Sequence, residues 1–275
     1  MTGAQALAQA IKTLRATGVP DAPRDARRLL AHAMGITPDR LTLMVQDDLS
    51  EQAAGAFDAM ITRRAARAPV SHIIGRRSFY GRDFIVSPDV LDPRPETEEL
   101  VALALQAPFE QVLDLGTGSG CILLTLLAEC PTARGIGVDM SPEALRVAQM
   151  NADHLRVNAT FKTSDWFENV TGQFDLIVSN PPYIALNEMP DLSPELSHEP
   201  QIALTDKADG LTAYRAISAG VGAHLRPRGR VLVEIGPTQA AAVMNLFTRA
   251  GLENVQAHAD LDGRDRVISA TAPLT

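Results

Sequence analysis

Patterns typical of strands and helices alternate along the chain from about residue 111 onward, and this alternation restricts the possible folds most. Short apolar runs of strand type cover residues 112–115, 135–138, 174–178 and 230–235. Helical patterns cover residues 121–129, 142–152, 211–223 and 239–250. Such alternation is typical of a doubly wound α/β sheet, in which ligands bind at the carboxyl ends of the strands.

The first part of the chain differs from this pattern and is predicted to be a small helical bundle. Leu7, Ile11 and Leu14 have the spacing of one helical face, and Ser50 has the side chain of an N-cap. Phe79-Tyr80-Gly81 then separates two short apolar runs, which indicates a β-hairpin linker. We therefore expect a helical, substrate-docking domain at 1–68, a hairpin linker at 69–92 and an α/β domain at 93–275.

Composition excludes several classes of protein. The chain is 45% hydrophobic and 21% charged, which is typical of a globular protein and not of a disordered one. No stretch approaches the roughly 18 apolar residues of a membrane span, and the first residues lack the apolar run of a signal peptide. A cytoplasmic protein that does not bind membranes is expected.

The cysteines, the histidines and the charge argue against metal and nucleic acid as ligands. Cys121 and Cys130 do not have metal-ligand spacing and are interpreted as packing residues, and no pair of histidines suggests a metal site. The first 90 residues carry 12 basic and 9 acidic side chains, which gives a net charge of +3. Because the whole chain has a net charge of -8, the remaining residues carry -11. This acidity argues against stable nucleic-acid binding.

Five arginines, expected on a solvated face, are the best candidates for docking a charged partner: Arg63, Arg64, Arg67, Arg76 and Arg77.

A glycine-rich turn follows the first strand of the α/β part. Gly116, Gly118 and Gly120 stand in the run Gly-Thr-Gly-Ser-Gly, and Asp139 ends the next strand pattern. Glycines let a ligand approach the backbone, and the acid can accept both hydroxyls of a ribose. Because Cys121 stands where a dinucleotide fingerprint needs glycine, the spacing favours S-adenosylmethionine over NAD. A plain βα turn with a helix-capping aspartate is the alternative.

A second motif, Asn180-Pro181-Pro182-Tyr183, follows the strand pattern at 174–178. Consecutive prolines supply no N–H groups, so the turn presents acceptors. The Asn180 side-chain oxygen and the Pro181 carbonyl can both accept from a planar NH2 group, on which Tyr183 can stack. A simple proline turn is the alternative, although the combination with the glycine loop favours a binding site.

With these motifs the chain resembles the protein-(glutamine-N5) methyltransferases, which modify the Gly-Gly-Gln loop of peptide-chain release factors. The resemblance covers nearly the whole chain and includes the glycine loop, the Asn-Pro-Pro-Tyr motif and further segments at 69–84, 93–98, 199–204, 209–211, 233–236 and 262–266. It implies a mostly parallel, seven-stranded Rossmann-like (class I methyltransferase) sheet, and S-adenosyl-L-methionine as cofactor with S-adenosyl-L-homocysteine as product. Separately from the resemblance, a monomer is expected.

The resemblance also implies roles for individual residues. Cofactor contacts are expected at Gly116, Thr117, Gly118, Ser119, Gly120, Asp139, Trp166 and Asn180. The substrate glutamine is expected at Asn180, Pro181, Pro182 and Tyr183, with Asn180, Pro181 and Tyr183 as catalytic residues. Trp166 is taken as an apolar wall for adenine rather than a surface anchor, and His198 with Glu199 as part of a lid rather than an acid–base pair.

Two other functions remain open from the sequence. An amino-group methyltransferase acting on adenine N6 or guanine N2 of nucleic acid would use the same Asn-Pro-Pro-Tyr motif, with the base flipped into the pocket. Such an enzyme would need a basic recognition region, which this acidic chain lacks. A non-catalytic nucleoside sensor would not need the intact motif at residues 180–183.

Overall fold

The computed structural model describes residues 1–274, and the chain divides into two compact units. The helical unit consists of Met1–Arg76 and Ser193–His198. The α/β unit consists of Arg77–Leu192 and the chain from Glu199 onward. The helical unit is therefore built from two separate stretches of sequence, and the chain passes between the units at three points.

The helical unit holds the expected bundle. Its helices are α1 (Gly3–Ala16), α2 (Ala22–Ala33), α3 (Leu41–Met44), α4 (Glu51–Ala65), α5 (Val70–Ile74) and the 3-10 helix η3 (Pro194–His198). Ser50 caps α4 by accepting from the Ala53 N–H, as the sequence indicated. Leu14, Leu29 and Phe57 are almost fully buried in the core. Helix α5 occupies the start of the predicted hairpin linker, and Gly75 ends it in the left-handed conformation (φ +76°).

A buried group of charges joins the two stretches of the helical unit. The Arg64 side chain is only 6% exposed, and its guanidinium lies 2.7 Å from Asp25 and 3.0 Å from Glu195. Glu195 also pairs with Arg67 at 2.7 Å, and the His198 ring is 3.0 Å from the Ala66 carbonyl. The expectation of a solvated face is wrong for Arg64, because two carboxylates compensate its charge inside the unit.

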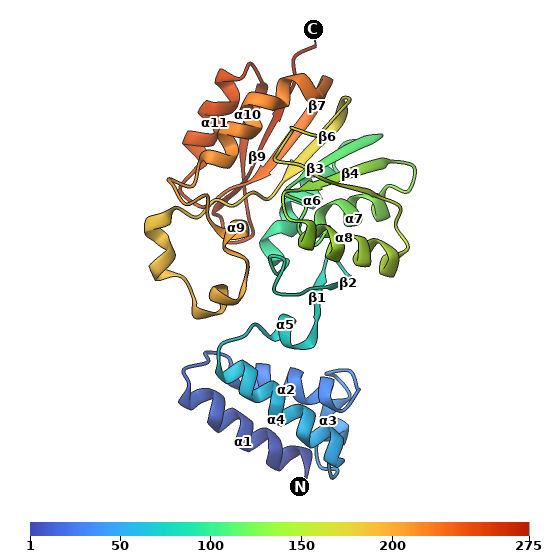
Figure 1. Cartoon of the computed structure of the whole chain (residues 1–275), viewed down its shortest axis with the longest axis vertical. Helices are drawn as coiled ribbons and strands as arrows, with labels where there is room; N and C mark the ends of the chain where they lie inside the picture. The colour runs from blue at the N-terminus through green and yellow to red at the C-terminus, as the bar shows by residue number, and fades with distance from the viewer. Residues whose placement is uncertain (275) are drawn as a thin grey trace. The chain divides into compact units, whose positions relative to one another are not determined.

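The α/β unit is built on one seven-stranded sheet (Figure 1). Its strands are β3 (Gln111–Leu115), β4 (Arg134–Asp139), β5 (Thr160–Thr163), β6 (Phe174–Ser179), β7 (Leu225–Glu234), β8 (Glu253–Ala259) and β9 (Asp265–Thr271). The order is β5-β4-β3-β6-β7-β9-β8; the first five strands are parallel, and β9 is antiparallel to both β7 and β8. The predicted mostly parallel, doubly wound class is confirmed.

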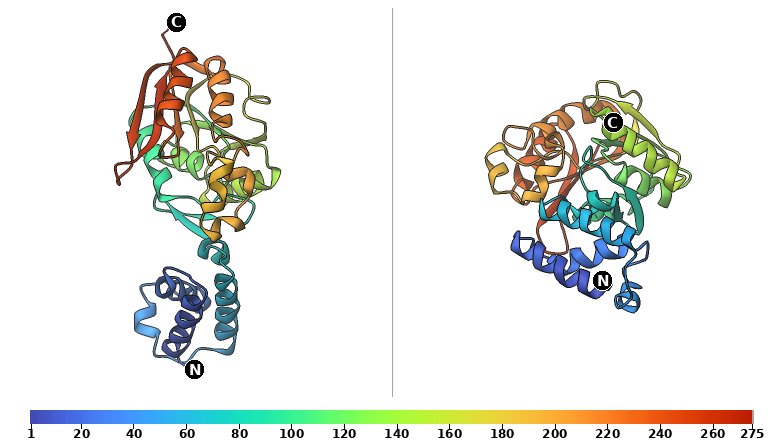
Figure 2. Two further views of the ribbon diagram at one scale, coloured as in Figure 1. Left: turned by 90° about the vertical axis from the view of Figure 1, so that its left-hand side faces the viewer. Right: turned by 60° about the horizontal axis from the view of Figure 1, so that its bottom comes forward.

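Helices cover both faces of this sheet (Figures 1 and 2). On one face lie α6 (Glu98–Ala104), α7 (Cys121–Glu129) and α8 (Pro142–Leu155), and on the other α10 (Thr212–His224) and α11 (Ala240–Arg249). In β6, Leu176 and Val178 pack toward α6 and α7, whereas Ile177 packs toward α10 and α11. Both faces of the strand are buried, which explains its continuous apolar run.

The remaining elements of the α/β unit are short. They are the hairpin β1 (Arg76–Phe79) with β2 (Arg82–Ile85), the 3-10 helices η1 (Pro95–Thr97) and η2 (Leu186–Asp191), and α9 (Gln201–Leu204). Phe79 and Phe84 meet edge to face at 6.0 Å between ring centroids and pack in one core with α6 and α7. The hairpin is thus an integral part of the α/β core.

The strand order places a topological switch point between β3 and β6. From β3 the chain runs outward through β4 and β5 on one side, and then returns to build β6 and β7 on the other. Diverging connections leave a crevice at the carboxyl ends of the strands there.

Among the described residues, no helix has both the length and the apolar character needed to cross a membrane.

Candidate active site

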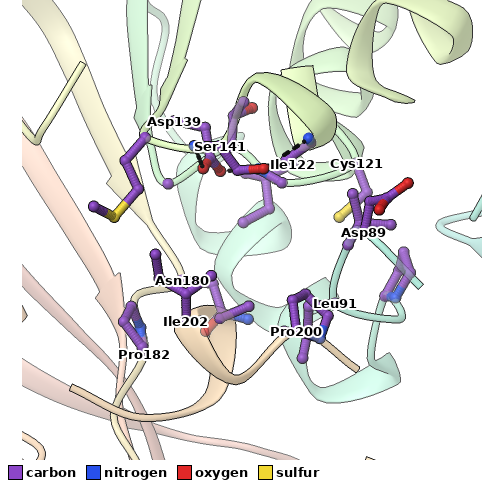
Figure 3. Close-up of a pocket in the computed structure, with 18 of the residues that line it drawn as sticks. Asp89, Leu91, Cys121, Ile122, Asp139, Ser141, Asn180, Pro182, Pro200 and Ile202 are labelled. Carbon is purple, nitrogen blue, oxygen red and sulfur yellow. Dashed lines mark hydrogen bonds between the residues drawn. The ribbon is translucent and has the colours of Figure 1, made fainter. Parts of the chain in front are cut away.

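A cavity lies at the carboxyl ends of β3, β4 and β6, with about 920 Å³ of empty space of which part is open solvent. Gly116 follows β3, Asp139 ends β4 and Asn180 follows β6, and all three line the cavity. Figure 3 shows Asp139 and Ser141 on one side, with Asn180 and Pro182 opposite them. The switch point thus brings together residues that are far apart in the sequence.

The glycines of the loop after β3 have two different environments. Gly116 (φ +68°) and Gly118 (φ +55°) have left-handed backbone, and a Cβ added to either would meet no protein atom within 4 Å. A Cβ on Gly120 would instead lie 3.1 Å from Leu124 and 3.3 Å from Ala148. Gly116 and Gly118 therefore leave space for a ligand, whereas Gly120 allows α7 and α8 to pack closely.

The other two residues of the loop also differ. Thr117 lines the cavity, and its hydroxyl donates to the buried Asp114 carboxylate at 2.6 Å. Burial raises the pKa of Asp114 to about 7. Ser119 is buried, its carbonyl accepts from Asn151 at 2.9 Å, and neither Ser119 nor Gly120 is among the residues that line the cavity. Cofactor contacts at these two positions stay predictions.

Asp139 is held in a fixed position by the backbone. Its Oδ2 accepts from the Gly118 N–H and its Oδ1 from the Ser141 N–H, both at 2.9 Å. Burial raises the pKa of this carboxyl, while the two hydrogen bonds lower it in part. A carboxylate offers about four acceptor positions, so two remain for the hydroxyls of a ribose.

Apolar side chains complete this side of the cavity. Ile122, Met140, Ala144 and Trp166 line it, and the Trp166 ring also packs against the core beside α10. Cys121 lines the cavity as well, and burial raises the pKa of its thiol to about 12, so the thiol stays protonated. Acceptors for a ribose beside apolar walls and an open glycine loop fit a nucleoside cofactor such as S-adenosylmethionine.

The Asn-Pro-Pro-Tyr motif forms the opposite wall. Asn180 Nδ2 donates to Thr97 Oγ1 at 3.1 Å, and both residues line the cavity together with Pro182. Pro181 and Tyr183 are not among the lining residues. The Tyr183 hydroxyl donates to Glu234 at 3.3 Å, and burial beside this acid raises its pKa. Stacking of Tyr183 on a substrate amide stays a prediction.

Two further segments form part of the wall, although none of their lining residues was assigned to the site from the sequence. The first lines the cavity with Asp89, Val90, Leu91, Pro93 and Arg94, and the second with Pro200, Ile202 and Ala203. Glu199 ties them together, because it accepts from the Asp92 N–H at 3.1 Å and pairs with Arg94 at 2.5 Å. Its side chain is only 1% exposed, so Glu199 holds the two segments together from inside the wall.

Within the described residues, no cluster of His, Cys, Asp and Glu is arranged to hold a metal ion.

Comparison with known proteins gives consistent results for both units. Residues 5–75 match the family model described as the PrmC N-terminal domain, and residues 86–207 match the Methyltransferase small domain. A release factor glutamine methyltransferase of Cereibacter sphaeroides is 55% identical, over 99% of both chains. Another from Agrobacterium fabrum is 41% identical over 96% of this chain and 95% of its own.

Solved structures show the same fold at low identity. A methyltransferase from Pyrococcus furiosus superposes with a TM-score of 0.56 and 16% identity, covering 78% of this chain and 98% of that one. A 16S rRNA N2 G1207 methyltransferase of T. thermophilus, solved with AdoMet and guanosine, superposes with a TM-score of 0.51 and 21% identity. The match covers 72% of this chain and 49% of that one.

Proposed function

The chain belongs to the release factor glutamine methyltransferases, and we propose that it transfers a methyl group to the side-chain amide nitrogen (N5) of the glutamine in the Gly-Gly-Gln loop of peptide-chain release factors. The observation that carries this function is the 55% identity to a protein of that name, which extends over both units. The cofactor is S-adenosylmethionine, and the product is S-adenosylhomocysteine. Acidity and the family relationship together disfavour nucleic acid as the substrate.

The cofactor supplies an electrophilic methyl group on a sulfonium centre. The chain's own residues hold it: backbone at Gly116 and Gly118 approaches the ligand, the Asp139 carboxylate accepts from the ribose, and Trp166 with Met140 borders the base. The open space beside the two glycines and the fixed position of Asp139 support this assignment.

The substrate amide requires positioning, because its nitrogen lone pair is delocalised into the carbonyl. A side-chain base of pKa about 4 to 7 is too weak to deprotonate it. Asn180 Oδ1 and the Pro181 carbonyl accept its two N–H groups, favour a tetrahedral nitrogen and direct the lone pair toward the methyl group. Once the N–C bond has formed, the nitrogen is strongly acidic and one of the two protons leaves to water. Orientation and preorganised dipoles of this kind lower the barrier by several kcal/mol without a catalytic carboxylate.

Further features belong to the same proposal. The helical unit docks the body of the release factor, and the acidic α/β unit attracts a basic loop that carries the glutamine. The enzyme acts as a monomer in the cytoplasm, where release factors meet ribosomes, and binds no nucleic acid stably. The match of residues 5–75 to a domain model of this family supports a dedicated role for the helical unit.

Incubation with S-adenosylmethionine and a panel of release factors, with the modified residue mapped by mass spectrometry, tests the function. One added methyl group on the glutamine of the Gly-Gly-Gln loop is expected. Methylation of DNA or RNA in parallel reactions, with none on the release factors, would reject the assignment.

A further inference from the structure

A buried acid lies behind the candidate active site and has no role in the mechanism above. Glu234 ends β7 and is only 1% exposed. Its Oε2 accepts from the Thr97 hydroxyl at 2.6 Å, and its Oε1 accepts from the Tyr183 hydroxyl at 3.3 Å. The Thr97 oxygen in turn accepts from Asn180 Nδ2 at 3.1 Å. An unbroken chain of hydrogen bonds therefore leads from the acid to the amide of Asn180.

The direction of this chain follows from the charge of the acid. An ionised carboxylate can only accept, so the Thr97 hydroxyl must donate to Glu234. The Thr97 oxygen then has only its lone pairs to offer, and Asn180 must turn its NH2 group toward it. Asn180 Oδ1 consequently faces away from Thr97 and is available as an acceptor.

We propose that Glu234 and Thr97 are positioning residues, which fix the Asn180 carboxamide so that its oxygen accepts from the substrate amide. The proposal rests on the function proposed above, since it explains how the enzyme keeps an acceptor at a position where a flipped asparagine would present a donor. A proton on Glu234 Oε2 makes that atom a donor to Thr97. The Thr97 hydroxyl can then donate to Asn180 Oδ1, which turns the NH2 group toward the substrate.

The acid is placed where its charge can change near neutral pH. Burial raises the pKa of Glu234 to about 7, while the hydrogen bonds from Thr97 and Tyr183 and the charge of Arg266 oppose the rise. The titratable or charged groups that act on it or respond to it are Glu96, Cys121, Tyr183, Tyr214 and Arg266. Because the active form is the ionised one, kcat should fall as pH falls through this pKa.

Substitution of Thr97 separates positioning from simple packing. Thr97→Val keeps the shape but removes the hydroxyl, and we expect kcat to fall by up to about 10²-fold with unchanged affinity for S-adenosylmethionine. Thr97→Ser should restore most of kcat, because it restores the hydroxyl. Thr125→Val is the matched control: Thr125 is fully buried in α7, and its hydroxyl has no partner among the described residues. Equal kcat values for Thr97→Val and the parent would overturn the proposal.

Two pH titrations complete the test. Kinetics are measured at saturating S-adenosylmethionine, so that protonation of Asp114 or Asp139 cannot act through weaker cofactor binding. The kcat of the parent on a release factor should then fall by up to tenfold for each pH unit below about pH 7, whereas Glu234→Gln should give a lower but flat profile. The side-chain 15N resonance of Asn180, identified by its loss in Asn180→Ala, should titrate with the same midpoint in the parent and not in Glu234→Gln.

The two readouts also distinguish this proposal from the proposed function. If the Asn180 resonance titrates but the enzyme does not methylate release factors, the proposed substrate is wrong, while the hydrogen-bond network of Glu234, Thr97 and Asn180 stands. A resonance that does not titrate, or parent kcat that stays flat between pH 5.5 and 8, would reject the network and leave the methyl transfer intact.

Discussion

Asp139 offers the most direct test of the cofactor site at the scale of single residues. Charge-assisted hydrogen bonds contribute roughly 1.5 to 3 kcal/mol in net terms, so Asp139→Ala should weaken S-adenosylmethionine binding by about 10- to 150-fold in calorimetric titrations. Glu143→Ala, at an exposed acid four residues further on, is the control and should bind normally. Unchanged affinity in Asp139→Ala would show that the Asp139 carboxylate does not bind the cofactor.

Asn180→Asp tests the substrate side, because it keeps one acceptor and the size of the side chain but removes the donor to Thr97. The new negative charge favours the sulfonium in the ground state, and this advantage shrinks as the transition state forms. Cofactor affinity should therefore be retained or rise, while kcat falls by roughly 10²- to 10³-fold. Steady-state kinetics together with a binding titration separate the two effects.

An Asn180→Asp enzyme within a few-fold of the parent would show that Asn180 does not hold the amide. Loss of activity that arises only from lost cofactor binding would give the same conclusion.

The site residues that the strand pattern could predict are those at the carboxyl end of a strand. Gly116, Asp139 and Asn180 each stand at the carboxyl end of an apolar run, so the parallel sheet brings them together. Thr97 and Glu234 could not be assigned in this way. They are 137 positions apart, and Thr97 is 83 positions from Asn180. No spacing in the sequence relates them, because only the packing of η1 against the end of β7 makes them neighbours.

At the scale of elements, α10 contains two glycines that should respond differently to the same substitution. A Cβ on Gly220 would lie 2.3 Å from the Phe167 ring, which is itself stacked on His224 at 4.7 Å. A Cβ on Gly222 would meet nothing within 4 Å. Alanine improves helix propensity at both sites by about 1 kcal/mol, but only Gly220→Ala forces a packed ring to move.

Gly222→Ala should therefore stabilise the protein, and Gly220→Ala should be less stable than Gly222→Ala by about 1 to 3 kcal/mol. Urea denaturation, followed by circular dichroism, measures both. Equal stabilities would mean that Phe167 repacks without cost, and that α10 is less tightly held against the sheet than its burial suggests.

Strands differed in how well the sequence revealed them. β3, β4, β6 and β7 are largely buried and show as apolar runs. β5 and β8 lie at the two edges of the sheet and have mostly exposed side chains, so they lack an apolar pattern. β9 is largely buried and was also missed, so the number of strands was available only through the family resemblance. The same resemblance could not show that residues 70–74 form a helix instead of hairpin.

At the scale of the whole molecule, removal of the helical unit tests its proposed docking role. The fragment should begin at Arg76 and not after the hairpin, because Phe79 and Phe84 are buried in the α/β core. We expect it to bind S-adenosylmethionine and to lose methylation of an intact release factor. Circular dichroism and the cofactor titration establish that it is folded. Full activity of a folded fragment would reject docking by the helical unit.

The two-part construction of the helical unit has a consequence for its synthesis. The ribosome releases Arg64 early, together with Asp25, but Glu195 follows 131 residues later. At about 5 to 20 residues per second, the wait lasts roughly 7 to 26 s. During that time the nascent bundle holds three of the four charges of its buried group, and Asp25 is the only carboxylate of that group that has been made. The bundle of residues 1–76 is thus completed only once residues 193–198 have left the ribosome, and until then it is more open to proteases and chaperones.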